Sequence, residues 1–439
     1  MRYPLIRALA WSLGLLAFAL GPMLLAYLGP GQPREFWVEM GVGLGFVGLS
    51  LLLLQFLLTG RYDQVAESFG LDSMLQFHKQ LGLIALVLIL AHPVVLFLTD
   101  PDYLEYLDPR VNFLRALSLS GVTGALLLLV ATSLWRVTFR LNYEWWRVVH
   151  GSLASFILLI GIVHPIQVGH YVAGPWLVGL FAAMGVGALA LLVNTRVIRP
   201  WRMRRRPWRL VEVRQERGEA ATLVFEPDGH EGFRFEPGQF AWLTLNDTPF
   251  TLQQHPFSFS SSADEAPGRL EFTIKGEGDF STWARQVDPG LTAFLEGPFG
   301  AFVPPRDPEV GCVMLVGGVG VTPCMSMLRT FADRGDTRPL VLIYANEELE
   351  GVIFRNEIEE LRESLDLEVI HVLEEPPEDW EGEEGLVDKD LLARLLPDDD
   401  RVYDHFVCGP EPMMDAVEKA LLALEVPQRR ILSERFNMV

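Results

Sequence analysis

Cysteine is scarce in this 439-residue chain, which contains only Cys312, Cys324 and Cys408. Their spacing matches neither a zinc-binding pattern nor a disulfide framework. All three lie in the second half of the sequence, and none is in a short loop that could face an oxidising compartment. The scarcity therefore argues against a disulfide-stapled scaffold and fits a reduced, cytoplasmic environment for that half.

Positive charge is also scarce in the second half. Residues 210–439 contain 19 Lys and Arg against 46 Asp and Glu, a net charge of −27, whereas residues 1–209 contain 17 against 10, a net charge of +7. Nucleic-acid binding requires a positive surface, so this balance argues against it. We interpret residues 210–439 as a soluble acidic module.

The first half contains apolar stretches long enough to cross a hydrocarbon layer of about 30 Å. The first stretch is too long for the apolar core of a signal peptide, and no small-residue cleavage site closes it. We therefore expect it to be a helix like the others. The six expected membrane helices lie near residues 5–28, 36–58, 75–98, 112–134, 144–168 and 174–195.

The charges of the connecting segments predict the orientation of these helices. Segments on one side carry Arg2, Arg7, Arg61, Lys79, Arg136, Arg140, Arg147 and the basic run at residues 201–209. Segments on the other side carry mainly Arg34, Arg110 and Arg115, with an acidic stretch at residues 100–105. The positive-inside rule places both termini and the second half in the cytoplasm, as expected for a multi-pass protein of the cell (inner) membrane.

Four histidines lie inside two of the apolar stretches, as two pairs with the same spacing. His78 and His92 are fourteen residues apart in the third stretch, and His150 and His164 are fourteen residues apart in the fifth. Fourteen helical residues rise about 21 Å and return to nearly the same face. Because the two helices should run in the same direction, His78 can face His150 near the inner surface and His92 can face His164 near the outer one.

Ionisable side chains inside membrane helices are costly and so suggest a function. A helix–helix hydrogen bond explains a single intramembrane histidine, but four with matched spacing are different. Two haems, each with two axial imidazoles, would satisfy all four side chains. Zinc and copper fit less well, because each level offers two ligands and no nearby Cys or carboxylate. Each second histidine precedes a proline, Pro93 or Pro165, which can kink the helix and open room for a macrocycle.

The second half predicts two architectures in succession, after an interfacial linker at residues 199–209. Short β-rich runs at residues 210–213, 221–225, 239–245 and 270–274 favour a small antiparallel barrel. Beyond residue 307, expected strands at 312–316, 339–344, 367–372 and 402–407 alternate with helices from 323, at 354–364, at 389–396 and from 412. This alternation is typical of a parallel sheet that binds nucleotides.

A glycine turn follows the first of these later strands. In Gly317-Gly318-Val319-Gly320-Val321-Thr322-Pro323 the glycines let the backbone approach a pyrophosphate, and the start of the next helix attracts its charge. The turn alone is a weak signal, because a tight turn needs glycine with or without a ligand. Cys408-Gly409-Pro410 ends a later strand, where ligands usually meet such sheets.

Three further motifs stand between these regions. They are His255-Pro256-Phe257-Ser258, Lys275 with Gly278-Asp279-Phe280-Ser281, and Glu296-Gly297-Pro298-Phe299-Gly300. Together with the glycine turn, Cys408-Gly409-Pro410 and the four histidines, they resemble the ferric reductase and NADPH oxidase superfamily over nearly the whole chain. The His-Pro-Phe variant of the first motif is typical of the membrane oxidase branch.

The resemblance implies the domains and cofactors. It implies a six-helix transmembrane domain with two b-type haems at residues 1–200, an FAD-binding β-barrel at 207–305 and an NAD(P)H-binding α/β domain at 306–439. The haem ligands would be His78, His92, His150 and His164. FAD would be bound by His255, Pro256, Phe257, Ser258, Lys275, Gly278, Ser281 and Phe436.

NADPH or NADH would be bound by Gly317, Gly318, Gly320, Thr322, Pro323, Cys408, Gly409 and Pro410. The resemblance gives catalytic roles to three of these residues. Ser258 would sit at the reactive edge of the flavin and Cys408 beside the nicotinamide. Phe436 would stack on the flavin and yield its place to the nicotinamide.

Three departures from the family pattern bear on function. Animal oxidases carry a further histidine four positions after the outer ligand of the third helix, where this chain has Leu96. No EF-hand loop is present, which argues against calcium control. Relatives specific for NADP often place Arg or Ser near the end of the second nucleotide strand. Here Glu347 would repel a 2′-phosphate or accept a hydrogen bond from a free 2′-OH, which is compatible with NADH as the donor, unless Arg355 compensates.

The leading hypothesis is a transmembrane NAD(P)H oxidase that passes electrons through FAD and two haems to oxygen, forming superoxide. A ferric-chelate reductase is the closest alternative, and an electron-relay subunit for a periplasmic partner protein is another. A diaphorase merely anchored by its helices is a further alternative, and it would bind no b-type haem. No obligatory protein partner is evident from the sequence.

Overall fold

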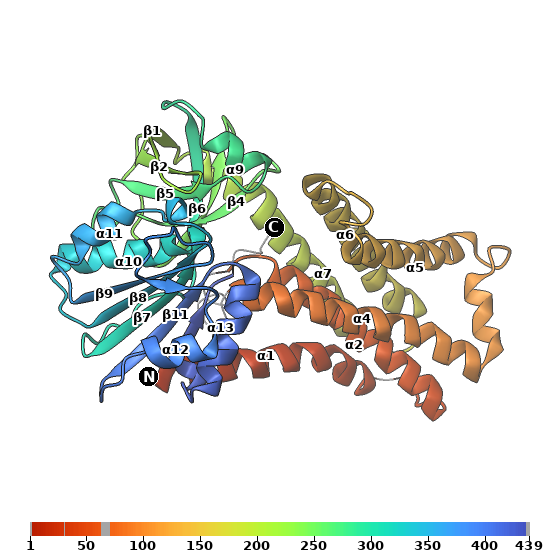
Figure 1. Ribbon diagram of the computed structural model, residues 1–439. Coiled ribbons are helices and arrows are strands. Elements are labelled where there is room, and N and C mark those ends of the chain that lie inside the picture. The colour runs from red at the N-terminus through yellow and green to blue at the C-terminus, as the bar shows by residue number, and fades with distance from the viewer. Residues whose placement is uncertain (1, 30, 63–70, 436–439) are drawn as a thin grey trace. The chain divides into compact units, whose positions relative to one another are not determined.

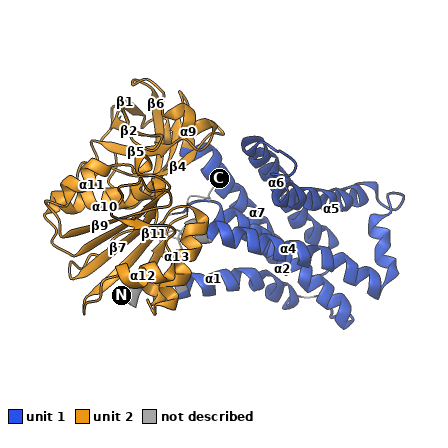
Figure 2. Ribbon diagram, in the orientation of Figure 1, with its two compact units in different colours: residues 1–199 blue, residues 200–439 orange. Residues whose placement is uncertain are grey.

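The computed structural model describes residues 2–29, 31–62 and 71–435. These residues form two compact units, residues 1–199 and residues 200–439 (Figure 2). The first unit is helical, and the second contains two sheets. Each unit is described separately below.

Among the described residues, six helices of the chain are long and apolar enough to cross a membrane. They are α1 (Arg2–Tyr27), α2 (Phe36–Leu58), α4 (Leu71–Thr99), α5 (Phe113–Leu134), α6 (Tyr143–Val168) and α7 (Pro175–Val193) (Figure 1). A short helix, η1 (Pro101–Leu107), follows α4. The six-helix prediction is thus confirmed.

The sixth span is longer than expected. A single π-helical turn, η2 (Asn194–Ile198), and the short helix α8 (Arg199–Met203) continue α7 directly. The first strand of the second unit begins at Trp208. Part of the basic run expected as a linker is therefore helix.

The helix ends of the first unit are set by local polar groups. Asn112 and Asn142 precede α5 and α6, and their side chains accept hydrogen bonds from backbone N–H groups of the first helical turn. Gly169 ends α6 in the left-handed conformation, with φ of 69°. Pro93 and Pro165 lie inside continuous helices, so neither ends its helix.

The core of the first unit lies along α2. Phe46, Leu49 and Leu53 of this helix are buried against α6 and α7 residues such as Leu158 and Phe181. Many apolar side chains on the other helices are exposed in the isolated chain, as expected for surfaces that face lipid. The exposed apolar surface thus agrees with a multi-pass membrane unit.

The first sheet of the second unit is antiparallel and curled. Its strand order is β4-β3-β6-β1-β2-β5. Phe259, directly after β4, forms a single β-bridge with Phe272 of β5. This bridge closes the sheet toward a barrel. The strands are β1 (Trp208–Gln215), β2 (Ala220–Pro227), β3 (Phe240–Leu245), β4 (His255–Ser258), β5 (Leu270–Lys275) and β6 (Thr292–Phe299), with helix α9 (Asp279–Ala284) after β5.

The second sheet is parallel, in the order β10-β9-β8-β7-β11-β12. Its strands are β7 (Val310–Gly317), β8 (Leu340–Asn346), β9 (Leu367–Leu373), β10 (Glu383–Glu384), β11 (Val402–Cys408) and β12 (Ile431–Ser433). The covering helices are α10 (Val321–Arg334), α11 (Arg355–Leu361), α12 (Lys389–Leu395) and α13 (Glu411–Ala423), with short turns η3 (Gly318–Gly320), η4 (Leu349–Gly351) and η5 (Gln428–Arg430).

Helices cover both faces of this parallel sheet. Residues of α10 and α11 share one buried cluster with the sheet, and residues of α12 and α13 share another (Figure 1). The central strand β7 is therefore apolar nearly throughout, as strands buried on both faces are. The predicted fold class, a helical membrane bundle followed by an antiparallel barrel and a parallel α/β sheet, is confirmed.

Candidate functional site

The four intramembrane histidines lie as two facing pairs. The rings of His78 on α4 and His150 on α6 have centroids 6.1 Å apart, with planes at 61°. The rings of His92 and His164, on the same two helices, have centroids 6.3 Å apart, with planes at 70°. The structure thus brings together both pairs expected from the sequence.

The spacing within each pair fits one metal ion between two imidazoles. A metal–imidazole bond is about 2.0–2.1 Å, and the ring centre lies roughly 1.1 Å behind the nitrogen, so collinear ligands place the centroids about 6.3 Å apart. Among the described residues no group of three or more His, Cys, Asp or Glu could hold a metal ion. A two-imidazole donor set suits haem, whose macrocycle supplies the remaining ligands.

The second nitrogen of two histidines is held by a hydrogen bond. Nδ1 of His92 lies 2.8 Å from the carbonyl oxygen of Gly41, to which it can only donate. Nδ1 of His150 lies 3.1 Å from Oγ of Ser133, whose own hydroxyl donates to the Leu129 carbonyl. Both bonds leave Nε2 unprotonated and able to bind a metal, an arrangement common around metal-binding histidines.

A polar cluster, which the sequence analysis did not predict, connects the segment before α2 with the segments that follow α4 and α6. Arg34, before α2, donates from Nε to His170 (3.1 Å) and from Nη1 to the Tyr103 hydroxyl (3.0 Å). The Tyr171 hydroxyl donates to the carboxylate of Glu39. Burial, together with Glu39, raises the pKa of the Tyr171 phenol, so it stays protonated.

The two expected flavin segments lie together in the antiparallel sheet. The ring of His255 on β4 stacks on Phe280 of α9, with centroids 4.0 Å apart and planes at 18°. The hydroxyl of Ser258 is buried and has no hydrogen-bond partner among the described residues. A buried hydroxyl without a partner costs about 1–3 kcal/mol, so this atom fits a bound group with a polar edge, such as a flavin.

The other expected flavin residues follow β5. Lys275 ends this strand and lies 3.5 Å from the carboxylate of Glu277. The Ser281 hydroxyl accepts the backbone N–H of Gly278 (2.9 Å) and shapes the turn before α9. Phe280 lies between Gly278 and Ser281 in the sequence and stacks on His255, so these residues lie next to that stack.

The glycine turn packs against the loop that follows β11. A Cβ added to Gly317 would lie 2.9 Å from Cδ of the Pro410 ring, and one added to Gly320 would lie 2.4 Å from the Cys408 carbonyl oxygen. Packing alone therefore requires glycine at these two positions. Gly318 differs, because its φ is +52° and no described atom lies within 4 Å of an added Cβ. The open backbone at Gly318 is where a ligand could approach.

The remaining nucleotide residues lie around this turn. Thr322 is buried and its hydroxyl donates to the Val319 carbonyl (3.0 Å), while Pro323 lies in the first turn of α10. Gly409 lies against Gly317, since an added Cβ would meet the Gly317 nitrogen at 3.0 Å. The structure therefore brings the glycine turn and Cys408-Gly409-Pro410 to one edge of the parallel sheet.

Phe436 lies outside the described residues. The chain leading to it is anchored beside β11: β12 pairs with that strand, and the Glu434 N–H donates to the Val407 carbonyl (3.2 Å). Arg435 is held by ion pairs with Asp415 (2.7 Å) and Glu418 (3.1 Å). The chain thus reaches residue 435 next to the strand that ends in Cys408.

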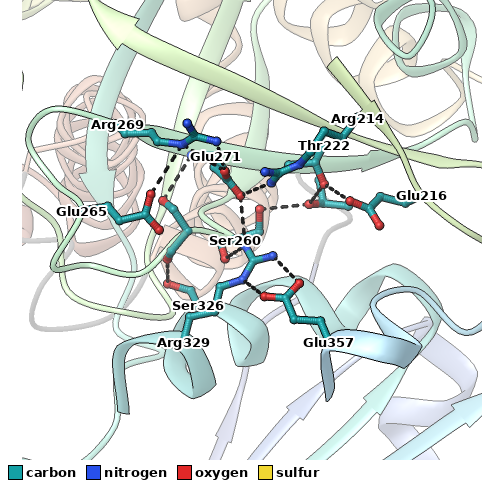
Figure 3. Close-up of polar contacts among 12 residues, drawn as sticks. Arg214, Glu216, Thr222, Ser260, Glu265, Arg269, Glu271, Ser326, Arg329 and Glu357 are labelled. Carbon is teal, nitrogen blue, oxygen red and sulfur yellow. Dashed lines mark hydrogen bonds and ion pairs between the residues drawn. The ribbon is translucent and has the colours of Figure 1, made fainter. Parts of the chain in front are cut away.

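A charged network joins the antiparallel sheet to the parallel one (Figure 3). Arg329 on α10 donates to Glu271 of β5 (3.1 Å) and makes a two-bond ion pair with Glu357 of α11 (2.6 and 2.7 Å). Glu271 also accepts from Arg214 (2.6 Å) and Arg269 (3.0 Å). The network lines a cavity of about 650 Å³, to which none of the expected flavin or nucleotide residues contributes.

Fold and site together define a class: a membrane-spanning oxidoreductase with flavin- and pyridine-nucleotide-binding sheets after its helices. Three family descriptions match the chain: "Ferric reductase like transmembrane component" at residues 44–161, "FAD-binding domain" at 211–301 and "Oxidoreductase NAD-binding domain" at 314–419. The chain belongs to the proteins of ferric reductase/NADPH oxidase-type architecture. A ferric reductase-like membrane component is thus fused to a flavin- and nucleotide-binding reductase module in one chain.

Curated relatives match 40–56% of the chain. NADH-cytochrome b5 reductase 1 of Pyricularia oryzae is 32% identical over 184 residues, which is 40% of this chain and 60% of the relative. A glycine betaine monooxygenase reductase subunit of Pseudomonas aeruginosa is 30% identical over 252 residues, which is 56% of this chain and 68% of the relative. The chain spans about three fifths of the length of the first relatives it matches.

Solved structures with a similar chain trace include two flavohaemoprotein-type chains. The FAD/NAD-binding domain of nitric oxide dioxygenase from Vibrio cholerae has a TM-score of 0.47 at 24% identity, covering 52% of this chain and 98% of that chain. The flavohemoglobin of Malassezia yamatoensis has a TM-score of 0.49 at 18% identity, covering 91% of this chain and 96% of that chain.

Proposed function

We propose that this protein oxidises NAD(P)H on the cytoplasmic side of the membrane and reduces oxygen to superoxide on the outer side. The observation that carries the proposal is the pair of facing imidazole sets, 6.1 and 6.3 Å between centroids, in one chain with flavin and nucleotide sheets. FAD would split the two electrons of a hydride into single steps, and two b-type haems would relay them.

The haem ligands in this proposal are His78 with His150 and His92 with His164. Two imidazoles would leave a bound haem iron without an open position, so the haem would supply single electrons to an acceptor at its edge. This favours single-electron products such as superoxide or ferrous iron. The protein's own contribution is to fix the spacing of the two pairs, about 21 Å apart along α4 and α6.

FAD is proposed to lie against β4 and α9. Ser258 would place its unpartnered hydroxyl at the reactive edge of the isoalloxazine, while His255, Pro256 and Phe257 would form the wall beside it. Lys275, Gly278 and Ser281 would hold the pyrophosphate. Phe436 would cover the flavin until the nicotinamide replaces it.

The dinucleotide is proposed to lie over the glycine turn. Its pyrophosphate would meet the backbone of Gly317, Gly318 and Gly320 at the start of α10, near Thr322 and Pro323. Cys408, Gly409 and Pro410 would flank the nicotinamide. We propose NADH as the better donor, because the exposed Glu347 directly follows β8, where a 2′-phosphate would be repelled.

Aromatic side chains support the proposed orientation in the cell membrane. At one end of the helices the exposed Trp135 and Trp145 lie near arginines, and Arg136 sits 5.1 Å from the Tyr143 ring. Trp37 and Trp176 are exposed where α2 and α7 begin, at the opposite end. Such belts mark the two membrane surfaces, and the arginine-rich end would face the cytoplasm.

We also propose the domain boundaries: residues 1–200 for the haem domain, 207–305 for the FAD domain and 306–439 for the nucleotide domain. The structural division at residue 199 and the gap between β6 and β7 lie close to these limits.

Ferric-chelate reduction is the second candidate, and one observation favours it. Leu96, at the position where animal oxidases have an additional histidine, is buried, and its Cδ2 would lie 3.1 Å from a Cβ added to Gly41. An apolar side chain there offers no proton or hydrogen bond to reduced oxygen. Reduction of a bulky chelate at the membrane surface needs no such group.

The test uses the purified full chain with NADH or NADPH. Reduction of cytochrome c that superoxide dismutase abolishes would support the oxidase. Fast anaerobic reduction of ferric citrate with negligible oxygen consumption would contradict the oxidase proposal and support a ferric-chelate reductase. Reduction of neither acceptor, with intact haem and flavin spectra, would favour a relay to a partner protein.

The haem assignment has its own test. Replacing His92 with alanine should lower the haem content from two to one per chain, while the exposed-loop variant Asp379→Asn keeps two. A protein that binds no b-type haem at all would instead be a membrane-anchored diaphorase, and the proposed function would be wrong.

A further inference from the structure

A glycine face of α2 lies directly against the outer histidine of α4. Gly41 and Gly45 are one helical turn apart, so they share a face. The carbonyl of Gly41 accepts the Nδ1–H of His92 at 2.8 Å. A Cβ added to Gly45 would lie 3.0 Å from Nδ1, 3.2 Å from Cγ and 3.3 Å from Cε1 of the same ring.

The two glycines act on the ring in different ways. Gly41 contributes a backbone oxygen that no substitution of its side chain removes, whereas Gly45 contributes the space that the imidazole occupies. Contacts of 3.0–3.3 Å are too close for a methyl group unless the ring moves. The ring is one of a facing pair, so movement would change both its hydrogen bond and its alignment with His164.

The inner pair lacks an equivalent arrangement. His150 donates to the hydroxyl of Ser133 at 3.1 Å, and Nδ1 of His78 is buried with no hydrogen-bond partner among the described residues. A peptide carbonyl oxygen is a stronger hydrogen-bond acceptor than a serine hydroxyl, and the contact to Gly41 is also the shorter of the two, 2.8 Å against 3.1 Å. The Nε2 of His92 is therefore the more basic ligand nitrogen of the two held histidines.

We propose that Gly41 and Gly45 are positioning residues that orient His92 and make the outer haem site the one of lower reduction potential. The inference rests on the proposed function, since it takes His92 as an axial ligand. A more basic ligand stabilises ferric over ferrous iron, and so lowers the potential. The close approach of two glycines to the ring thus sets an electronic difference between two sites with the same ligands.

The first test is a redox titration of the full chain, followed by its visible spectrum. The wild-type protein should show two midpoint potentials, and in His92→Ala the one that disappears should be the lower. If the higher one disappears, the proposal is wrong. This comparison does not depend on any glycine variant folding.

The second test is Gly45→Ala, with Gly187→Ala as its control. Gly187 is exposed on α7, and a Cβ added there would meet nothing within 4 Å, so that variant should keep both potentials. Gly45→Ala should retain two haems, move the lower potential to more positive values and change one of the two low-spin ferric EPR signals. Two bound haems with unchanged potentials and signals would overturn the positioning role.

The outcomes separate this inference from the proposed function. If wild-type protein shows no bis-imidazole haem spectrum, the proposed function fails. If it shows two such haems and neither test finds the expected shift, only the role of Gly41 and Gly45 fails.

Discussion

At the scale of single residues, the buried hydroxyl of Ser258 is the clearest indication of a bound group. Its hydroxyl is buried on β4 without a hydrogen-bond partner in the described part of the chain. Tertiary packing removes water from this atom, yet provides no other acceptor or donor. A cofactor edge at this position would restore the missing hydrogen bond.

Ser258→Ala should therefore slow flavin reduction by NADH about 10- to 100-fold, since a hydrogen bond to a reacting group is worth about 1.5–3 kcal/mol. FAD should remain bound, because the other contacts persist. Stopped-flow bleaching of the flavin measures the rate, and Ser364→Ala, in the exposed turn after α11, serves as control. A rate equal to that of the control would remove Ser258 from the reactive edge.

His405 predicts an acid sensitivity. It lies on β11 and is 8% exposed, and burial lowers its pKa, although a hydrogen bond with the backbone of Arg430 and the charge of Asp404 partly oppose this. As pH falls through about 6.5, the unfolded chain binds a proton that the folded chain does not. The free energy of unfolding should therefore decrease below that pH, until the folded-state pKa is reached.

Replacement of His405 by Gln should make the free energy of unfolding depend less steeply on pH. Thermal unfolding of the full chain between pH 7.5 and 5 measures this pH dependence. His371, whose pKa is also lowered by burial, should account for part of what remains. An identical slope in wild-type and variant proteins would contradict the contribution of His405.

At the scale of secondary-structure elements, Arg329 connects three of them. From α10 it reaches Glu271 on β5 and Glu357 on α11, and it also donates to the Ser260 carbonyl at 2.6 Å (Figure 3). The side chain of Arg329 is 13% exposed and that of Glu271 is 4% exposed. Such a buried network holds the two sheets of the second unit in one arrangement.

Arg329→Met should destabilise the second unit by about 1–3 kcal/mol, because the Ser260 carbonyl and the Glu271 carboxylate each lose a buried donor while Arg214 and Arg269 still pair with Glu271. Arg362→Met is the matched control: the Arg362–Glu359 pair on α11 is 47% exposed on both sides, and such pairs contribute about 1 kcal/mol or less. Urea unfolding of the full chain, followed by flavin fluorescence, compares them. Equal losses in the two variants would show that the network is not a stabilising one.

Four strands were not predicted because the local sequence carries no clear strand signal. β4 contains Pro256 and β6 contains Pro298, and proline is disfavoured inside strands, so neither segment was expected as a strand. β10 and β12 have two and three residues, too few for a periodic pattern. Each of these strands forms because a neighbouring strand holds it, which local sequence does not reveal.

At the scale of the whole molecule, the orientation across the membrane can be tested with introduced cysteines. All three native cysteines are buried, and burial raises the pKa of Cys312 to about 12. Thiol reagents attack the thiolate, so the background should be low. Arg110→Cys, in the exposed segment before α5, should react with a membrane-impermeant maleimide on intact cells.

Asp379→Cys, on the exposed surface of the second unit, is the counterpart. It should react only after the membrane is permeabilised, because the proposed orientation places that unit in the cytoplasm. The reverse pattern would invert the topology and, with it, the direction of electron flow.

Features that depend on local geometry can be read from the amino-acid sequence of this protein. Helix periodicity alone places His78 with His92, and His150 with His164, on one face at a fixed rise, and hydropathy alone marks the six spans. The glycine turn was visible for the same reason, since a tight turn between strand and helix is a local property. The roles of these residues as ligands remain predictions.

The groups that surround those residues follow from tertiary packing and could not be predicted from the sequence. The 2.8 Å contact of His92 with Gly41, the room that Gly45 leaves for the ring, and the Ser133 hydroxyl at His150 all join different helices. The Arg329 network likewise joins segments 58 residues apart in sequence. Such contacts depend on how the helices and sheets pack, because residues far apart in the chain meet only when their elements pack together.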